Sequence, residues 1–198
     1  MLTGEVNPSG KLAMTFPVSE ADLPHPVIPP LSAADEGQGT GADNGRTHSE
    51  SRYTVRYDEG VKVGYKWYDA EKKPVLFPFG YGLSYTTYGY SGLKVAPGAE
   101  TTVTFTVKNT GSRAGVEIAE VYAGLPASAG EPPKRLVGWS RVKLNPGESR
   151  EVSVAIDPKY LSIFDETVDG WKLLPGEYSF MVGGSSQALP LSGKVTLK

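Results

Sequence analysis

The chain contains 198 residues and no cysteine. This absence excludes disulfide scaffolds, thiolate zinc sites, iron–sulfur centres and cysteine nucleophiles. Only two histidines occur, His25 and His48, and they lack the i, i+4 spacing of a helical metal pair. Each is predicted to be a solvated loop residue. We therefore expect no metal and no other cofactor.

The chain also lacks a large excess of charge of one sign and any long apolar run. Lys and Arg number 20 against 22 Asp and Glu, with no basic cluster, so nucleic acid is not an expected partner. No stretch approaches the roughly 18 consecutive apolar residues that cross a bilayer, so a membrane partner is not expected either. Residues 1–11 show no basic region followed by an apolar run, so no signal peptide is expected. The compartment stays open.

Glycine and proline are abundant, with 24 and 16 residues, about a fifth of the chain. This content favours a turn-rich β protein over a helical bundle. Residues 101–108 and 150–156 alternate inward apolar with outward polar side chains. Further strands are predicted at 116–123, 136–144, 177–182 and 189–197, separated by turn clusters. Residues 91–198 are therefore predicted to form an immunoglobulin-like β-sandwich of the fibronectin type III variety.

The first 52 residues look different. Residues 11–16 form one strand candidate with apolar residues on both parities, which predicts a strand buried on both faces, as in an α/β layer. No long amphipathic helix pattern exists to cover such a sheet. Residues 32–52 contain no large apolar residue and are predicted to be a flexible loop or linker. We expect residues 1–31 to belong to an incomplete α/β domain.

Residues 53–90 carry eleven aromatic side chains among glycines and prolines. The glycines and prolines interrupt any helical period, so we expect a packed aromatic connection with short strands. The rings could form a sugar-stacking platform, or they could anchor a core and an interface. Tight backbone packing favours the structural role.

No complete catalytic apparatus is visible. Gly82-Leu83-Ser84-Tyr85 lacks the second glycine of a nucleophile elbow. Asp58-Glu59 and Asp165-Glu166 are adjacent carboxylates, but neighbours on an extended chain point to opposite faces. A glycosidase needs two carboxyl groups aimed at one bond. Both pairs are therefore predicted to be solvated or structural.

Ordered motifs carry a family resemblance. They are Asn7-Pro8-Ser9-Gly10-Lys11 with Phe16-Pro17, Tyr57-Asp58-Glu59-Gly60 with Gly64-Tyr65-Lys66-Trp67-Tyr68, Phe77-Pro78-Phe79-Gly80-Tyr81-Gly82-Leu83-Ser84-Tyr85, Asn109-Thr110-Gly111, Glu120-Val121-Tyr122, Lys134-Arg135-Leu136-Val137-Gly138-Trp139, Asn145-Pro146-Gly147-Glu148 and Pro175-Gly176-Glu177-Tyr178. Together they resemble the C-terminal region of glycoside hydrolase family 3, which includes β-glucosidases and β-xylosidases.

The resemblance implies a parent enzyme in which a barrel carrying the nucleophile and an α/β sandwich carrying the acid/base precede a fibronectin type III-like domain. No residue of this chain inherits either catalytic role. The chain would be the structural C-terminal portion of a retaining β-glycosidase, inactive alone, with the barrel and the α/β sandwich as its partners. The alternative is an autonomous β-sandwich module that binds carbohydrate or protein.

The resemblance assigns structural, interdomain roles to nine residues. Gly60 and Gly64 would flank a short strand where the backbone approaches closely, and Gly80 and Gly82 would form a tight turn. The aromatic members are Tyr65, Tyr68, Phe77, Phe79 and Tyr81. Lys66 stands where the family usually has Arg, so a carboxylate contact there loses the bidentate fork. If the rest of the α/β domain is absent, Leu12, Met14 and Phe16 would expose apolar surface, and self-association is expected.

Overall fold

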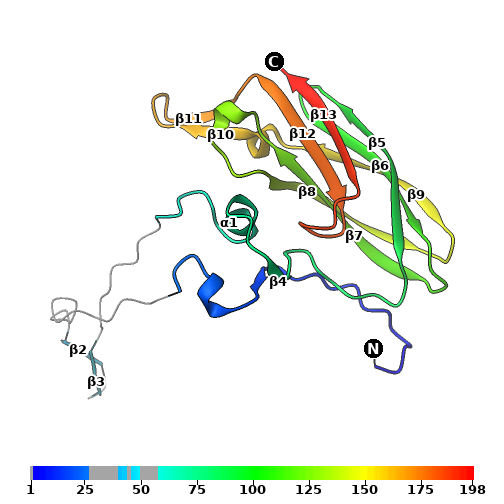
Figure 1. The fold of residues 1–198 in the computed structure, drawn as a ribbon, viewed down its shortest axis with the longest axis horizontal. Helices are drawn as coiled ribbons and strands as arrows, with labels where there is room; N and C mark the ends of the chain where they lie inside the picture. Colours follow the sequence, from blue (N-terminus) through cyan, green and yellow to red (C-terminus); the bar gives the residue numbers. More distant parts are fainter. Residues whose placement is uncertain (1, 27–39, 44–45, 50–57) are drawn as a thin grey trace.

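The computed structural model describes residues 2–26, 40–43, 46–49 and 58–198. Figure 1 shows a twisted β-sandwich with a separate layer of coil and short elements beneath it. The strands outside the sandwich are β1 (Phe16–Pro17), β2 (Thr40–Asp43), β3 (Arg46–Ser49), β4 (Val75–Phe77), β10 (Ser162–Asp165) and β11 (Gly170–Leu173). Helical turns are η1 (Glu20–Asp22), α1 (Tyr65–Ala70), η2 (Ala127–Ala129) and η3 (Pro158–Leu161).

Seven strands build the sandwich. A four-stranded sheet has the order β13 (Leu191–Leu197), β12 (Gly176–Gly183), β7 (Gly115–Gly124) and β8 (Arg135–Leu144). A three-stranded sheet has the order β5 (Tyr88–Ala96), β6 (Thr101–Asn109) and β9 (Ser149–Ile156). All pairings are antiparallel. The predicted mainly β fold with a fibronectin type III-like sandwich is confirmed.

The core between the two sheets follows from side-chain alternation. Along β6, every second residue from Thr101 is buried, and Val103, Phe105 and Val107 are fully enclosed. Tyr178 and Phe180 of β12 face them from the other sheet. Burying each large apolar side chain contributes about 1.5–3 kcal/mol, so this cluster holds the two sheets together.

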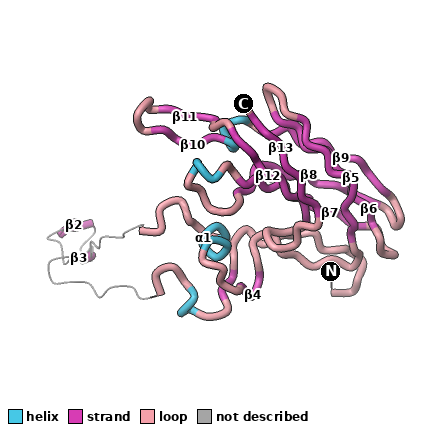
Figure 2. The backbone as a smooth tube through the Cα atoms, turned by 45° about the horizontal axis from the view of Figure 1, so that its top comes forward, coloured by secondary structure: helices cyan, strands magenta, loops and turns pink. Residues whose placement is uncertain are grey.

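Some predictions for the sandwich were incomplete. The first strand, β5, begins at Tyr88, so it crosses position 90, where the aromatic connection was predicted to end. The hairpin of β10 and β11 was not predicted and pairs with neither sheet. Figure 2 shows this hairpin projecting from one end of the sandwich.

The predicted strand at 11–16 is wrong in extent and in burial. Only Phe16–Pro17 pairs as a strand, with β4, and Leu12 exchanges backbone hydrogen bonds with Gly80 and Tyr81. Met14 is 60% exposed and Phe16 is 39% exposed. No described element covers their outer side, so the second burying layer that the apolar pattern predicts is missing.

The aromatic connection also differs from expectation in one respect. A helix, α1, forms at Tyr65–Ala70 although the glycines around it were expected to prevent helical structure. Gly64 begins the helix with φ 59° and ψ −132°, a conformation that only glycine adopts readily. The glycine therefore starts the helix instead of interrupting it.

The predicted flexible loop at 32–52 lies mostly outside the described residues. Its described parts are β2 and β3, which pair antiparallel. His48 is in β3, and the prediction that its side chain is solvated remains untested. The assignment of the chain into segments 1–31, 32–52, 53–90 and 91–198 likewise remains a prediction.

Candidate functional site

The candidate site is the junction between the described residues 2–26 and 58–87 and the outer face of the four-stranded sheet. On β7, Ala119, Val121 and Ala123 point into the sandwich core, while Glu120 and Tyr122 lie on the opposite face. A strand with one solvated face would expose them, yet Glu120 is 4% exposed and Tyr122 is fully buried. The segment around α1 and Gly80 covers them, as the adjacency of α1, β4 and the sandwich in Figure 1 indicates.

Rings and a glycine enclose this pair. The ring of Tyr65 packs edge-on against Tyr122 at 5.7 Å and tilted against Phe79 at 5.1 Å. Gly80 lies against the Glu120 carboxylate so closely that a Cβ there would overlap the carboxylate oxygens. The Tyr122 hydroxyl donates a hydrogen bond to Glu120 Oε2 at 2.6 Å. A small residue at position 80 is therefore a condition of the packing.

Polar contacts fasten α1 to the beginning of β8. The backbone N–H of Leu136 donates to the Tyr65 hydroxyl at 2.6 Å. Lys134 forms an ion pair with Asp69 at 2.6 Å, and both side chains are only 12% exposed. Charged pairs of this burial are costly to break, because one ion would be left unpaired. The helix is thus held as part of the sandwich.

A second group of contacts fastens the N-terminal residues to the other end of β7. Lys11 Nζ donates to the Gly184 carbonyl at 2.9 Å and lies 3.4 Å from Glu117 Oε1. The Tyr90 hydroxyl of β5 donates to the same carboxylate oxygen at 2.6 Å. Glu117 thus joins both sheets and the N-terminal segment.

Asn7 adds to this attachment. Its Nδ2 donates to the Ala114 carbonyl, and its Oδ1 accepts from the Ser84 hydroxyl and from the backbone N–H of Tyr85. The turn predicted at residues 7–10 therefore connects three segments. Gly82 lies so near the Gly10 carbonyl that a Cβ would overlap it.

Burial controls the electrostatics of the junction. It raises the pKa of Glu120 to about 7, although the Tyr122 hydrogen bond and the charge of Lys11 oppose the shift. Burial also raises the pKa of Tyr65 to about 12 and raises those of Tyr90 and Tyr122 still more, so these phenols stay protonated, and Tyr90 and Tyr122 act as hydrogen-bond donors. A raised carboxyl pKa suits a general acid, but the enclosed Glu120 leaves no path to a substrate.

The structure brings together seven of the nine predicted interdomain residues. Tyr65, Phe79, Gly80 and Gly82 lie in the junction as described. Phe77 packs on Tyr81 at 5.0 Å and on Phe16 at 6.3 Å. The interdomain role of all nine remains a prediction. The full set of seven is Tyr65, Tyr68, Phe77, Phe79, Gly80, Tyr81 and Gly82.

The other two, Gly60 and Gly64, do not lie at a close approach between backbone segments. No described atom lies within 4 Å of a Cβ built at either residue, and no strand separates them. Both have positive φ, 57° and 59°, in a turn and at the start of α1. Backbone conformation, not space, is therefore the reason for glycine at these positions.

Sequence reasoning missed three junction residues, Glu117, Glu120 and Lys11. Acidic residues on a strand normally indicate an outward, solvated face. The one signal in the sequence is that no charged residue follows Glu120 before the end of β7; in the structure every residue from Ala119 to Gly124 is buried. Lys66 is half-buried, and burial followed by the charge of Arg135 lowers its pKa.

The adjacent carboxylates are not an acid/base couple. Hydrogen bonding to His25 lowers the pKa of Glu59, and hydrogen bonds from Thr167 and Lys172 lower that of Asp165. Neither is poised as a neutral acid. His25 is exposed but pairs with Glu59 at 2.8 Å, so it is more than a solvated loop residue.

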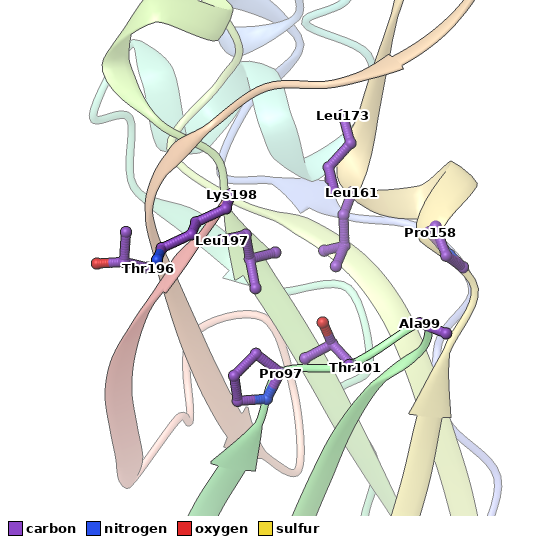
Figure 3. Close-up of a pocket in the computed structure, with 10 residues that line it drawn as sticks. Pro97, Ala99, Thr101, Pro158, Leu161, Leu173, Thr196, Leu197 and Lys198 are labelled. Atoms are coloured by element: carbon purple, nitrogen blue, oxygen red, sulfur yellow. The ribbon is translucent and has the colours of Figure 1, made fainter.

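A separate hollow of about 340 Å³ lies at the end of the sandwich away from the N-terminal attachment. Figure 3 shows Pro97, Pro158, Leu161, Leu173 and Leu197 around it. Its lining has no carboxylate, and Lys198 is its one charged residue. The hollow therefore lacks the paired acids that glycoside hydrolysis needs.

Residues 2–26 and 58–198 contain no group of three histidine or acidic side chains placed to hold a metal ion. Among the described helices, none has the length and apolar character to cross a bilayer.

Comparison with known proteins agrees with this geometry. A family model for the fibronectin type III-like domain matches residues 117–186. β-Glucosidase B of Emericella nidulans is 39% identical over 204 residues, covering 100% of this chain and 23% of that protein. The β-glucosidase of family 3 from Bifidobacterium adolescentis has a TM-score of 0.81 at 36% identity, covering 100% of this chain and 27% of that one.

The resemblance to the C-terminal region of glycoside hydrolase family 3 enzymes is confirmed. Thermostable β-glucosidase B of Acetivibrio thermocellus, 36% identical, matches 98% of this chain and 24% of its own length. The chain thus spans about a quarter of the curated relatives it matches. In those relatives, this family 3 region is one part of a larger protein.

Replacing Gly80 with alanine tests the junction packing. We expect Gly80→Ala to lower the free energy of unfolding by about 2–4 kcal/mol, because the left-handed backbone costs about 1–2 kcal/mol and the buried Glu120–Tyr122 hydrogen bond is also disturbed. Gly147 is the matched control, since its φ of 74° is similar to the 79° of Gly80 but its Cβ would meet no atom. Urea unfolding that gives equal losses for both variants would contradict the packing.

The raised pKa of Glu120 predicts a pH dependence. The folded state holds this proton more tightly than the unfolded state, in which the carboxyl titrates near its ordinary 4.5. The contribution to stability is therefore complete below about pH 4.5 and lost as pH rises to about 7. Thermal unfolding should show that the melting temperature of Glu120→Gln rises relative to that of the wild type as the pH increases from 5 to 8.

Glu148 supplies the control. Hydrogen bonds from the Asn145 backbone and from Arg150 lower its pKa, so its titration falls below this range. The difference between Glu148→Gln and the wild type should stay constant from pH 5 to pH 8. Parallel pH curves for Glu120→Gln and the wild type would show that Glu120 is not held protonated.

Proposed function

We propose that this chain is the structural C-terminal portion of a retaining β-glucosidase and has no glycosidase activity alone. Its role is to hold the segments at residues 2–26 and 58–87 firmly against the sandwich, so that the preceding catalytic domains of the parent enzyme are fixed in position. The observation that carries this proposal is the buried attachment at Glu117 and Glu120. A match of nearly the whole chain to about a quarter of the length of enzymes named β-glucosidases supports the substrate class.

Exposed apolar side chains in the N-terminal half favour contact with a neighbouring domain. Large apolar side chains are exposed along β1, β4 and the turn before α1, at Met14, Val18, Val61, Val63 and Leu76. Each is more than half exposed. Several large apolar side chains exposed on neighbouring segments are typical of a surface that contacts protein. The partners proposed are the barrel and the α/β sandwich that precede this region in the family.

The alternative, an autonomous carbohydrate- or protein-binding module, has one supporting observation. Phe164 and Trp171 are each about half exposed on the β10–β11 hairpin, with ring centroids 5.7 Å apart. The aromatic segment that first suggested a sugar platform gives less support, because Tyr65 and Phe79 pack inward. Carbohydrate binding therefore stays the second candidate.

Activity measurements distinguish the two candidates. The isolated chain should not hydrolyse an aryl β-glucoside, because the described carboxylates form no acid/base couple. A chimaera in which this chain replaces the matching region of Emericella nidulans β-glucosidase B should be active. Turnover by the isolated chain that is lost on substitution of one carboxylate would overturn the proposal. Glucan binding by the chain with an inactive, misfolded chimaera would favour the alternative.

Self-association of the isolated chain is also expected. Met14, Phe16 and Leu76 expose apolar surface next to the short β1–β4 pair, whose outer edges are unpaired among the described strands. Light scattering should therefore give a mass above that of a monomer, and Met14→Ser with Leu76→Ser should reduce it. A strict monomer that keeps residues 11–16 ordered would contradict this expectation.

A further inference from the structure

The outer face of the four-stranded sheet is covered at Glu120 and Tyr122 of β7 but is exposed along part of β8. In the register of β7 with β8, Glu120 lies opposite Trp139, Ile118 opposite Arg141 and Val116 opposite Lys143. Residues directly opposite in an antiparallel pair share a face. The side chains of β8 thus lie beside Glu120, which Gly80 covers. Gly138 supports this orientation, because its Cα faces Val154 and Ile156 in the core.

Trp139, Arg141 and Lys143 form what we call the β8 strip. Trp139 is 65% exposed and has no hydrogen bond or ring contact within residues 2–26 and 58–198. Arg141 and Lys143 are exposed and form no ion pair with the same residues. Nothing in the described chain explains an unpartnered indole beside two unpaired cations.

Cations at the covered junction behave differently. Lys11, Lys134 and Arg135 each pair with a carboxylate and are no more than 15% exposed. Along β8 the covered part ends before Trp139, because the Leu136 N–H contacts Tyr65 of α1 whereas Trp139, opposite the buried Glu120, is 65% exposed. The β8 strip therefore continues the junction rather than forming a separate surface.

We propose that the β8 strip is a contact surface for the domain that precedes this region in the parent enzyme. That domain would receive the indole of Trp139 in an apolar hollow and place carboxylates against Arg141 and Lys143. Continuity with the covered junction and the uncompensated positive charge identify this occupant. The inference rests on the proposed function, because it requires the parent enzyme's neighbouring domain.

The experiment compares strip variants with matched controls in the Emericella chimaera. Trp139→Ala is paired with Trp171→Ala, a similarly exposed indole on the separate β10–β11 hairpin. Arg141→Ala is paired with Lys194→Ala, an exposed cation on β13. Thermal inactivation of the chimaera should be about 5–30-fold faster for Trp139→Ala, which is the range expected for an interface anchor. Arg141→Ala should also accelerate inactivation, but by a smaller factor. The two controls should match the wild type.

Unfolding of the isolated chain separates contact from fold stability. Trp139→Ala should change its melting temperature little, because the indole is 65% exposed and forms no ring contact or side-chain hydrogen bond with the described residues. If Trp139→Ala destabilises the isolated chain as much as the chimaera, the strip acts within this chain and the inference is wrong. An inactive wild-type chimaera would count against the proposed function instead.

Two further outcomes would show that the β8 strip binds a different partner. If Trp139→Ala converts an oligomer of the isolated chain into a monomer, as measured by light scattering, the strip binds a second copy. If Trp139→Ala abolishes retardation of the chain in a soluble-glucan gel while Trp171→Ala does not, the strip binds carbohydrate. Equal inactivation rates for Trp139→Ala and Trp171→Ala in an active chimaera would overturn the inference outright.

Discussion

The hydrogen bond from Tyr122 to Glu120 depends on burial of both faces of β7, and the rest of the junction depends on the same burial. A carboxyl group enclosed in this way is stable only with a donor at hand and with its proton largely retained. Tyr122 supplies the donor, and the Gly80 backbone excludes water. The covering segment cannot leave without exposing two buried aromatic rings and a carboxyl group together.

Two sets of contacts divide the attachment along β7. At one end, Lys11 and Tyr90 converge on Glu117, so an N-terminal residue and a strand of the opposite sheet share one carboxylate. At the other end, Asp69 and Tyr65 of α1 reach the beginning of β8. Because the sites lie at opposite ends of one strand, they prevent rotation of the covering segment as well as its departure.

The sequence was sufficient for the sandwich, because β6, β9 and β12 alternate apolar and polar residues as a half-exposed sheet requires. It was insufficient where tertiary context overrides the pattern. Glu120 resembles a solvated strand residue until the segment at 65–82 is placed over it. Residues 11–16 resemble a buried strand, but no described element covers the outer side of Met14 and Phe16. The helix α1 was missed because Gly64 begins it in a conformation that sequence patterns treat as an interruption.

The path of β5 has a consequence for how this region can move or be exchanged. Its strand starts at Tyr88, inside the aromatic segment, and continues to Ala96 as an edge of the three-stranded sheet. Boundaries between domains usually fall in exposed, flexible linkers. Here a continuous hydrogen-bonded strand occupies the place of a linker. A cut at that point would not give a sandwich that can be transplanted to another enzyme. The sandwich would lose the segment around α1 and Gly80 that covers Glu120 and Tyr122.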